Sequence, residues 1–203
     1  MAEEHIFIES GELKIEGLLD DLPGDRGVVV THPHPLYGGE MRNNVVETIA
    51  QAYREEGYST LRINFRGVGR SQGKHDNGIG EQEDVRAALT YLSDLNKVNI
   101  DLAGYSFGAW VNALGLESFE HVNRMVMVSP PVNFIDFSFL KSNSTIKLVI
   151  VGTNDDIAGA KAVEELLPAW NPEAVFRTIR GADHFYWGME DKMKAIIKNF
   201  LSE

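Results

Sequence analysis

A regular alternation of two kinds of segment, beginning after Pro23-Gly24, constrains the fold more than any other feature of the sequence. Short apolar runs rich in β-branched residues alternate with longer stretches of helical pattern. The apolar runs cover 28–30, 60–65, 98–103, 124–128, 146–151 and 175–179, and the helical stretches cover about 43–55, 81–95, 109–117, 160–167 and 189–201. Strands that are apolar throughout are buried on both faces, so the alternation predicts an α/β fold: a mostly parallel central sheet with helices on both faces.

The residues before this alternation follow a different pattern. Residues 5–9 alternate apolar and polar side chains, Ser10-Gly11 is typical of a turn, and the apolar pattern resumes at Leu13. This pattern predicts an N-terminal antiparallel β-hairpin. With 203 residues, 43% of them hydrophobic, the chain is long enough to bury a core, and we expect one domain over residues 1–203.

Charge and composition argue against several classes of partner. A formal net charge of −11 disfavours nucleic acid and anionic membrane surfaces, which would repel the protein. No apolar run reaches the roughly 18 residues of a membrane span, and the N-terminus lacks the basic and apolar regions of a signal peptide. The absence of cysteine excludes disulfides and a thiol nucleophile. We therefore expect a cytoplasmic protein with no nucleic acid or membrane partner, and we leave a homodimer open.

Two segments, 69–73 and 104–108, match the pattern Gly-x-Ser-x-Gly. In a nucleophile elbow, a strand leads directly into a serine held in a strained turn, and a helix follows directly. Ser106 meets these conditions, because an apolar strand precedes it and a helical stretch follows. Ser71 lies several residues beyond its strand and precedes a polar segment, so we interpret it as part of a turn. The sequence therefore predicts Ser106 as a nucleophile.

A serine nucleophile needs a base to accept its proton and an acid to orient that base. In this architecture the chain order is serine, acid, histidine, and only His121 and His184 follow Ser106. His121 precedes a predicted strand and would lie at the wrong edge of the sheet. His184 follows the last predicted strand, so we expect it on the same side as Ser106.

The orienting acid should follow the preceding strand, 146–151. Asp155 and Asp156 both do so. We favour Asp155 as the triad acid and expect Asp156 to cap the following helix. Asp136, in the previous loop, is a weaker candidate.

An oxyanion hole needs two N–H donors. The backbone of Phe107, directly after the serine, should supply one. The second should come from the loop 31–39, in which the prolines at 33 and 35 have no N–H. Leu36 is the first choice and His34 the second. His32 and His34 have no evident third ligand, so we expect neither a metal nor any other cofactor, and instead a role in shaping this loop.

The connector 130–145 has sixteen residues, too few to form a separate helical cap domain over the site. An open, shallow site is therefore expected. We predict that Tyr37, Tyr105, Phe134 and Phe185 contact the substrate. The sequence leaves open whether the other apolar side chains of the connector cover the cleft or pack the connector down; these are Ile135, Phe137, Phe139 and Leu140.

Three segments together resemble the α/β-hydrolase superfamily, and specifically its small, dienelactone-hydrolase-like bacterial members. They are His-Pro-His-Pro at 32–35, Asn-Phe-Arg-Gly-Val-Gly-Arg-Ser at 64–71 and Gly-Ala-Asp-His-Phe at 181–185. The resemblance runs from about residue 27 to the C-terminus and implies an α/β-hydrolase fold without a cap. It also implies that the acid stands fourth in Gly-x-x-Asp, which is Asp155. Serine replaces the cysteine nucleophile of true dienelactone hydrolases, so their substrate is not implied.

The predicted function is hydrolysis of short-chain carboxylic esters through an acyl-enzyme, with a small-molecule ester as substrate. A thioesterase or a small peptidase would use the same residues. From a different class, the chain could be a binding protein on a hydrolase fold that does not turn over.

Overall fold

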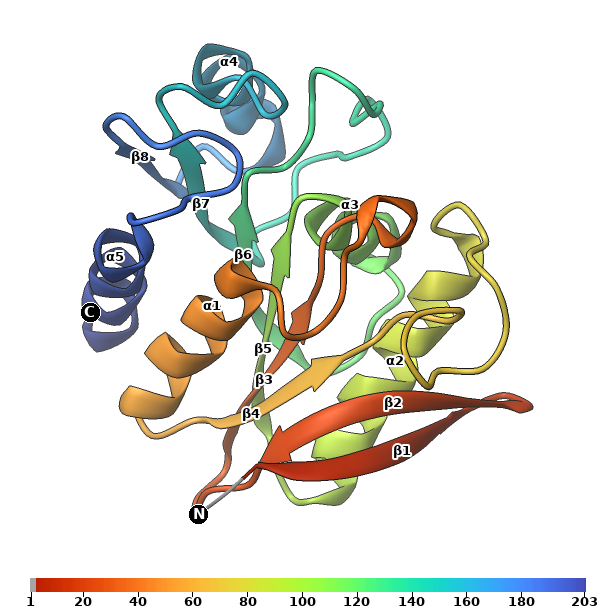
Figure 1. The fold of residues 1–203 in the computed structure, drawn as a ribbon. Helices are drawn as coiled ribbons and strands as arrows, with labels where there is room; N and C mark the ends of the chain where they lie inside the picture. The colour runs from red at the N-terminus through yellow and green to blue at the C-terminus, as the bar shows by residue number, and fades with distance from the viewer. Residues whose placement is uncertain (1–2) are drawn as a thin grey trace.

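Eight strands form one sheet in the computed structural model, which describes residues 3–203 (Figure 1). Their order across the sheet is β1-β2-β4-β3-β5-β6-β7-β8. β1 pairs with β2 and β2 with β4 in antiparallel fashion, and every other pair is parallel. The predicted parallel sheet and N-terminal hairpin are thus confirmed. The strands are β1 (Glu4–Ser10), β2 (Leu13–Asp20), β3 (Arg26–Thr31), β4 (Ser59–Ile63), β5 (Asn99–Tyr105), β6 (Val122–Val128), β7 (Ile146–Gly152) and β8 (Val175–Ile179).

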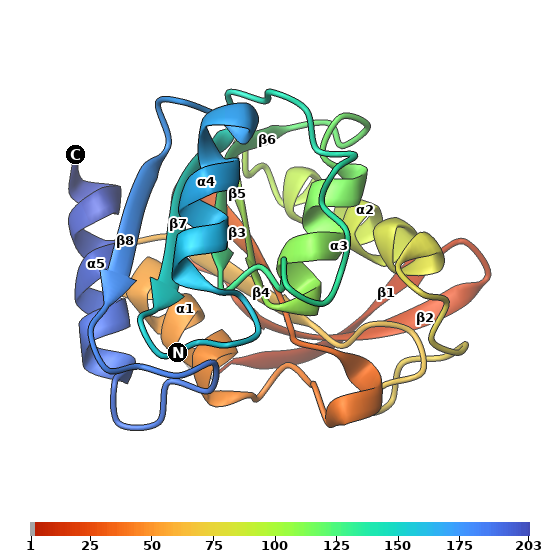
Figure 2. The same cartoon turned by 90° about the horizontal axis from the view of Figure 1, so that it is seen from above.

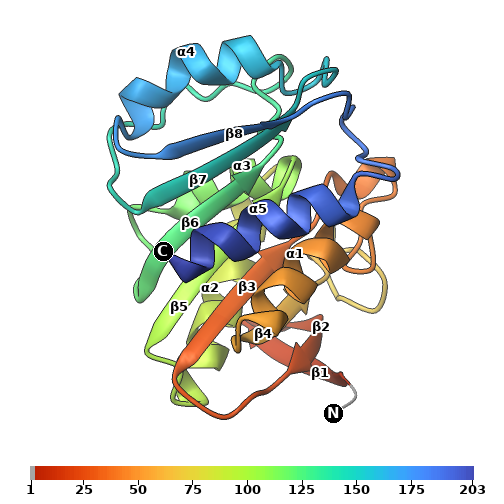
Figure 3. The same ribbon diagram turned by 90° about the vertical axis from the view of Figure 1, so that its left-hand side faces the viewer.

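Helices cover both faces of this sheet, as the alternating pattern predicts. α1 (Asn44–Glu55) and α5 (Glu190–Ser202) pack side by side on one face (Figure 3). α2 (Ile79–Asp94), α3 (Phe107–Gly115) and α4 (Ala160–Trp170) lie on the other, as the view from above shows (Figure 2). Among residues 3–203, no helix is both long and apolar enough to cross a bilayer.

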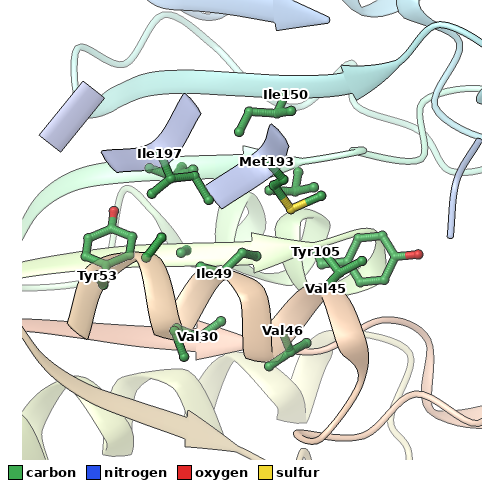
Figure 4. Close-up of a cluster of buried hydrophobic side chains, with 14 of the residues drawn as sticks. Val30, Val45, Val46, Ile49, Tyr53, Tyr105, Ile150, Met193 and Ile197 are labelled. Carbon is green, nitrogen blue, oxygen red and sulfur yellow. The ribbon is translucent and has the colours of Figure 1, made fainter. Parts of the chain in front are cut away.

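The side-chain alternation of the central strands explains why both faces need helices. Val28 and Val30 of β3 belong to the core cluster on the side of α1 and α5, whereas Val29 between them belongs to the cluster on the side of α2 and α3. Each buried aliphatic side chain stabilises the fold by roughly 1.5–3 kcal/mol relative to exposure. On the α1–α5 side, β3, β5, β6, β7 and β8 supply the sheet layer of this core, which is drawn with residues such as Val30, Ile49, Tyr105, Ile150, Met193 and Ile197 (Figure 4).

The helix starts differ from the sequence prediction for local reasons. α2 begins at Ile79, two residues earlier than expected, because the buried Glu81 carboxylate accepts the backbone N–H groups of Asp76 and Gly78, both at 2.9 Å. α3 begins at Phe107, directly after the serine, rather than at 109. Only Ser106 therefore separates the end of β5 at Tyr105 from the start of α3 at Phe107, so the position of the serine is fixed by both elements.

The connector between β6 and β7 contains neither helix nor strand, so the predicted absence of a cap domain is confirmed. Its apolar side chains divide into two groups. Phe137 and Leu140 are buried, and the Phe137 ring lies 5.4 Å from that of Trp170 in α4. Phe134 is 73% exposed and, with Ile135, lines the cleft described below. The connector is thus partly packed down and partly available to a ligand.

Candidate active site

Ser106 is the single residue between β5 and α3, and its backbone angles are φ 54° and ψ −118°. A positive φ is strained for a residue with a side chain and persists only where the surroundings impose it. Here the Ser106 N–H donates to the Val128 carbonyl of β6 at 2.9 Å, and the Ser106 carbonyl accepts the Trp110 N–H at 3.2 Å. The turn is therefore fixed from the sheet on one side and from the helix on the other.

The glycines on either side of Ser106 are required by the close crossing of β5 and α3. A Cβ atom on Gly104 would lie 2.6 Å from the Ala109 nitrogen. A Cβ atom on Gly108 would lie 2.6 Å from Oγ1 of Thr31 and 2.7 Å from the carbonyl oxygen of the same residue. Both clashes involve backbone atoms, which cannot move aside cheaply. This crowding is the physical reason for the Gly-x-Ser-x-Gly pattern at this position.

A continuous line of hydrogen bonds joins three of the predicted residues. The Nε2 atom of His184 lies 2.9 Å from Ser106 Oγ, and its Nδ1 atom lies 2.9 Å from Asp155 Oδ2 and 3.0 Å from Oδ1. A carboxylate only accepts hydrogen bonds, so Nδ1 carries the proton and Nε2 is the acceptor that faces the serine hydroxyl. Sequence-distant loops after β5, β7 and β8 thus bring these side chains together at one edge of the sheet.

The Asp155 carboxylate is held by more than the histidine. Oδ1 accepts the N–H groups of Ile157 and Ala158 at 2.9 and 2.8 Å, and Oδ2 accepts the Ser129 hydroxyl at 2.6 Å. Burial by itself would raise the pKa of Asp155, but the hydrogen bonds from His184, Ala158 and Ser129 and the charge of His184 outweigh it. The pKa of Asp155 therefore lies below its usual value, and the group is a carboxylate at neutral pH.

Ser129 and Tyr186 form a second layer behind Asp155 that sequence reasoning missed. The Ser129 hydroxyl proton is committed to Asp155, so the Tyr186 hydroxyl, 2.6 Å away, is the donor to Ser129 Oγ. Both side chains are fully buried, and Ser129 itself has a positive φ of 47°. The position of Ser129 at the carboxyl end of β6 was the only signal in the sequence.

The His184 loop is fixed by two further contacts. The buried hydroxyl of Tyr105 donates to the His184 carbonyl at 2.7 Å, and Asp183 accepts the N–H groups of Phe185 and Tyr186. Tyr105 thus reaches the site chiefly as a support for His184. Burial raises the pKa of Tyr105 well above its usual value, so this hydroxyl remains a donor.

The other candidate acids and bases lie elsewhere. Asp156 does not cap α4, because that helix begins at Ala160 with Gly159 at its N-cap; the prediction of a capping role is wrong, and Asp155 itself accepts the turn's N–H groups. Asp136 is exposed and bonded to Ser138. His121 is exposed and pairs loosely with its neighbour Glu120. None of these three side chains contacts the line from Ser106 to Asp155.

Ser71, in the other Gly-x-Ser-x-Gly segment, has a structural position. Its hydroxyl accepts the Glu16 N–H at 2.9 Å and donates to the Asn64 carbonyl at 2.7 Å. It thereby ties the loop after β4 to β2. Arg66, in the same loop, forms an ion pair with the buried Asp84 at 2.8 Å and so braces the loop.

The His-Pro-His-Pro loop is organised by its first histidine. His32 is fully buried, its Nε2 accepts the Phe65 N–H at 3.0 Å, and its Nδ1 therefore donates to the Pro33 carbonyl at 2.6 Å. Burial lowers the pKa of His32 to about 4, so the ring is neutral. His32 thus shapes the loop through hydrogen bonds. Within residues 3–203, no group of three or more histidine, aspartate or glutamate side chains is arranged to hold a metal ion.

The same loop argues against Leu36 as the second oxyanion donor. Its N–H donates to Nδ1 of His34 at 3.2 Å, and its side chain is 70% exposed and lines a separate groove. The backbone N–H of His34, by contrast, has no acceptor among residues 3–203. The available donor is therefore one that sequence reasoning ranked second.

A cleft of about 680 Å³ opens above Ser106 and His184. The four residues predicted to contact substrate, Tyr37, Tyr105, Phe134 and Phe185, all line this cleft. The side chains of Tyr37 and Phe185 are 88% and 53% exposed, whereas Tyr105 is buried in the floor of the cleft. Trp187, 72% exposed, does not line the cleft. The remaining lining is Pro33, His34, Gly38, Gly39, Asn43, Phe107, Pro131, Ile135 and Ile157.

Comparison with known proteins places this geometry in a family. No protein-family model matches the chain. It is 38% identical to an uncharacterized protein of Rickettsia prowazekii, over 97% of this chain and 87% of that protein. An alpha-beta serine hydrolase homologue from Coxiella burnetii has 33% identity and a TM-score of 0.90, over 98% of this chain and 97% of its own.

A further solved structure bears on the missing cap. It comes from Xanthomonas campestris, is described as an α/β serine hydrolase without a lid, and has 28% identity and a TM-score of 0.91, over 100% of this chain and 94% of its own. The sheet order, the uncapped connector and these similarities agree. The chain belongs to the α/β-hydrolase superfamily, among its small members without a lid.

Proposed function

We propose that this protein is a serine hydrolase that cleaves short-chain carboxylic esters through an acyl-enzyme. The observation that carries the proposal is the line of hydrogen bonds from Asp155 through His184 to Ser106, in which His184 and Ser106 line an open cleft. Serine at its ordinary pKa is a poor nucleophile, and an oriented imidazole is what such a site needs to activate it.

In the acylation step, His184 Nε2 takes the proton of Ser106 Oγ as that oxygen bonds to the ester carbonyl carbon. The carbonyl π electrons move onto its oxygen, and the Asp155 carboxylate stabilises the imidazolium that results. The intermediate then collapses, the bond to the alkoxy oxygen breaks, and His184 donates its proton to the departing alcohol. Deacylation repeats these steps with water as the nucleophile and releases the acid and free Ser106.

The developing oxyanion needs two donors, and we assign them to the backbone N–H groups of Phe107 and His34. Phe107 is the first residue of α3, where an N–H has no partner within the helix. The His34 N–H also has no acceptor in the described part of the chain. In this assignment His34 replaces Leu36, whose N–H is already committed.

The substrate range follows from the open cleft. Without a cap, only the side chains of the loops contact a bound acyl chain. The far end of a long acyl chain therefore extends into solvent and adds little binding free energy. A thioester or a small amide would react with the same residues, because the triad sets the class of reaction and not the leaving group.

Covalent labelling with a fluorophosphonate, followed by mass spectrometry, tests the proposal before any substrate is known. We expect one adduct, on Ser106, and loss of both labelling and p-nitrophenyl acetate hydrolysis in Ser106→Ala. Ser71→Ala is the matched control from the second Gly-x-Ser-x-Gly segment and should label normally. Labelling that survives in Ser106→Ala contradicts the assignment, and a wild-type protein that never labels favours a binding protein that does not turn over.

A further inference from the structure

The imidazole of His34 lies in the cleft but takes no part in the mechanism above, which uses only its backbone N–H. The side chain is partly exposed and lines the same cleft as Ser106 and His184. It therefore borders the space above Ser106, and its hydrogen-bonding state determines what it can recognise there.

That state is set by a neighbour in the loop. The Leu36 N–H donates to His34 Nδ1, so in the neutral ring the proton is on Nε2. Burial lowers the pKa of His34, and the nearby His75 lowers it further, which keeps the ring neutral at pH 7. Nε2 has no hydrogen-bond partner among residues 3–203. It is not among the buried side-chain atoms that lack a partner, so solvent reaches it. The ring thus presents an unpaired N–H donor.

The donor is also held in place. The His34 ring packs at centroid distances of 4.7 Å from Phe107, 4.9 Å from Tyr37 and 5.1 Å from His75. Three ring neighbours and the bond to Leu36 leave little rotational freedom. When a substrate displaces water from this apolar cleft, an unpaired N–H costs free energy unless the substrate supplies an acceptor.

We propose that His34 is a specificity-determining residue whose Nε2–H binds a second oxygen acceptor in the substrate. The favoured substrates are then esters with an ether, keto or hydroxyl oxygen within a few bonds of the scissile carbonyl, rather than plain hydrocarbon esters. This inference rests on the proposed esterase function and specifies its substrate class.

Pairs of esters that differ by one oxygen test it. On the acyl side, p-nitrophenyl methoxyacetate is compared with p-nitrophenyl butyrate, and on the alcohol side, 2-methoxyethyl acetate with butyl acetate. The measurement is the ratio of kcat/KM within each pair, for the wild type and for each variant. Comparing ratios between proteins cancels the intrinsic reactivity of the esters.

Two variants separate the donor from the rest of the residue. His34→Asn keeps the backbone N–H and an oxygen able to accept the Leu36 N–H, but loses the distant donor. His34→Gln restores an N–H at about the distance of Nε2. We expect His34→Asn to lower the oxygen-to-hydrocarbon ratio about tenfold in at least one pair, and His34→Gln to recover most of it.

The outcomes are distinguishable. A purely structural role of His34 would lower kcat/KM equally for both members of each pair, and a ratio unchanged within about twofold in both pairs overturns the inference while the esterase function stands. If the wild type hydrolyses none of the four esters, the proposed function fails and this inference fails with it.

Discussion

Replacing Asp155 with asparagine tests the orientation of the proposed catalytic base more sharply than deleting the carboxylate would. The side chain keeps its shape, and the local contacts dictate which way the amide faces. The N–H groups of Ile157 and Ala158 both point at Oδ1, so the amide oxygen must take that place. The NH₂ group then occupies the position of Oδ2, 2.9 Å from Nδ1 of His184.

An NH₂ group at 2.9 Å can only donate, which favours the tautomer in which Nδ1 of His184 accepts and Nε2 carries the proton, in competition with the longer bond from Nδ1–H to the amide oxygen at the Oδ1 position, 3.0 Å away. Nε2 faces Ser106 Oγ at 2.9 Å and in this tautomer can no longer accept the serine proton. The altered tautomer lowers kcat by about four orders of magnitude in serine hydrolases of this design. We expect a loss of that size in Asp155→Asn, with KM changed much less, because the cleft itself is untouched.

The assay is stopped-flow hydrolysis of a p-nitrophenyl ester, together with the second-order rate of fluorophosphonate labelling, which reports Ser106 activation without deacylation. Asp156→Asn is the matched control, because the neighbouring side chain is exposed and does not contact the line from Ser106 to Asp155. The reasoning is refuted if kcat of Asp155→Asn stays within tenfold of the wild type, or if Asp156→Asn suffers the larger loss.

Three further predictions follow from the same structure. Gly108→Ala should lower stability by about 1–3 kcal/mol through its clash with Thr31, and a denaturant midpoint equal to the wild type would contradict this. Ser129→Ala removes a hydrogen bond to a carboxylate and takes away the acceptor of the buried Tyr186 hydroxyl proton; we expect a loss of about 2–4 kcal/mol in urea unfolding, and Tyr186→Phe in the same background should recover part of it. Finally, kcat/KM should rise over the first few acyl carbons, at about 0.8 kcal/mol per buried methylene, and then flatten; a rise that continues past about ten carbons would reveal a tunnel.

The depressed pKa of Asp155 gives a pH-dependent prediction with a definite sign. A carboxyl group whose pKa is lower in the folded than in the unfolded state contributes stability above the unfolded value, near 3.9, and loses it as the pH falls toward the folded value. The wild type should therefore lose more unfolding free energy than Asp155→Asn between pH 5 and 3, as measured by urea titrations at each pH. Equal losses of unfolding free energy in the two proteins would show that the Asp155 carboxylate does not contribute this pH-dependent stability.

Much of the architecture could be predicted from the chain because local patterns carry it. The two-residue alternation of the first strands predicts the N-terminal hairpin, and the continuous apolar runs of the later ones predict a parallel sheet covered on both faces, whereas the order of the strands comes from the structure alone. The strand before Ser106, the small residues at 104 and 108 and the helix after it identify the elbow without knowledge of the fold. The positions of Asp155 and His184 after strands followed from the parallel sheet, whose carboxyl ends lie at one edge.

Tertiary structure decided which partner each polar group and each aromatic ring takes. Which N–H group of the His-Pro-His-Pro loop stays free depends on His34 Nδ1, which accepts the Leu36 N–H. The support of Asp155 by Ser129 and Tyr186 joins three loops that no local pattern relates. The connector's aromatic side chains are alike in sequence, yet Phe137 packs against Trp170 while Phe134 faces the cleft. Backbone periodicity is a local property of the chain, whereas the partner of a polar group or an aromatic ring is known only when the whole chain is in place.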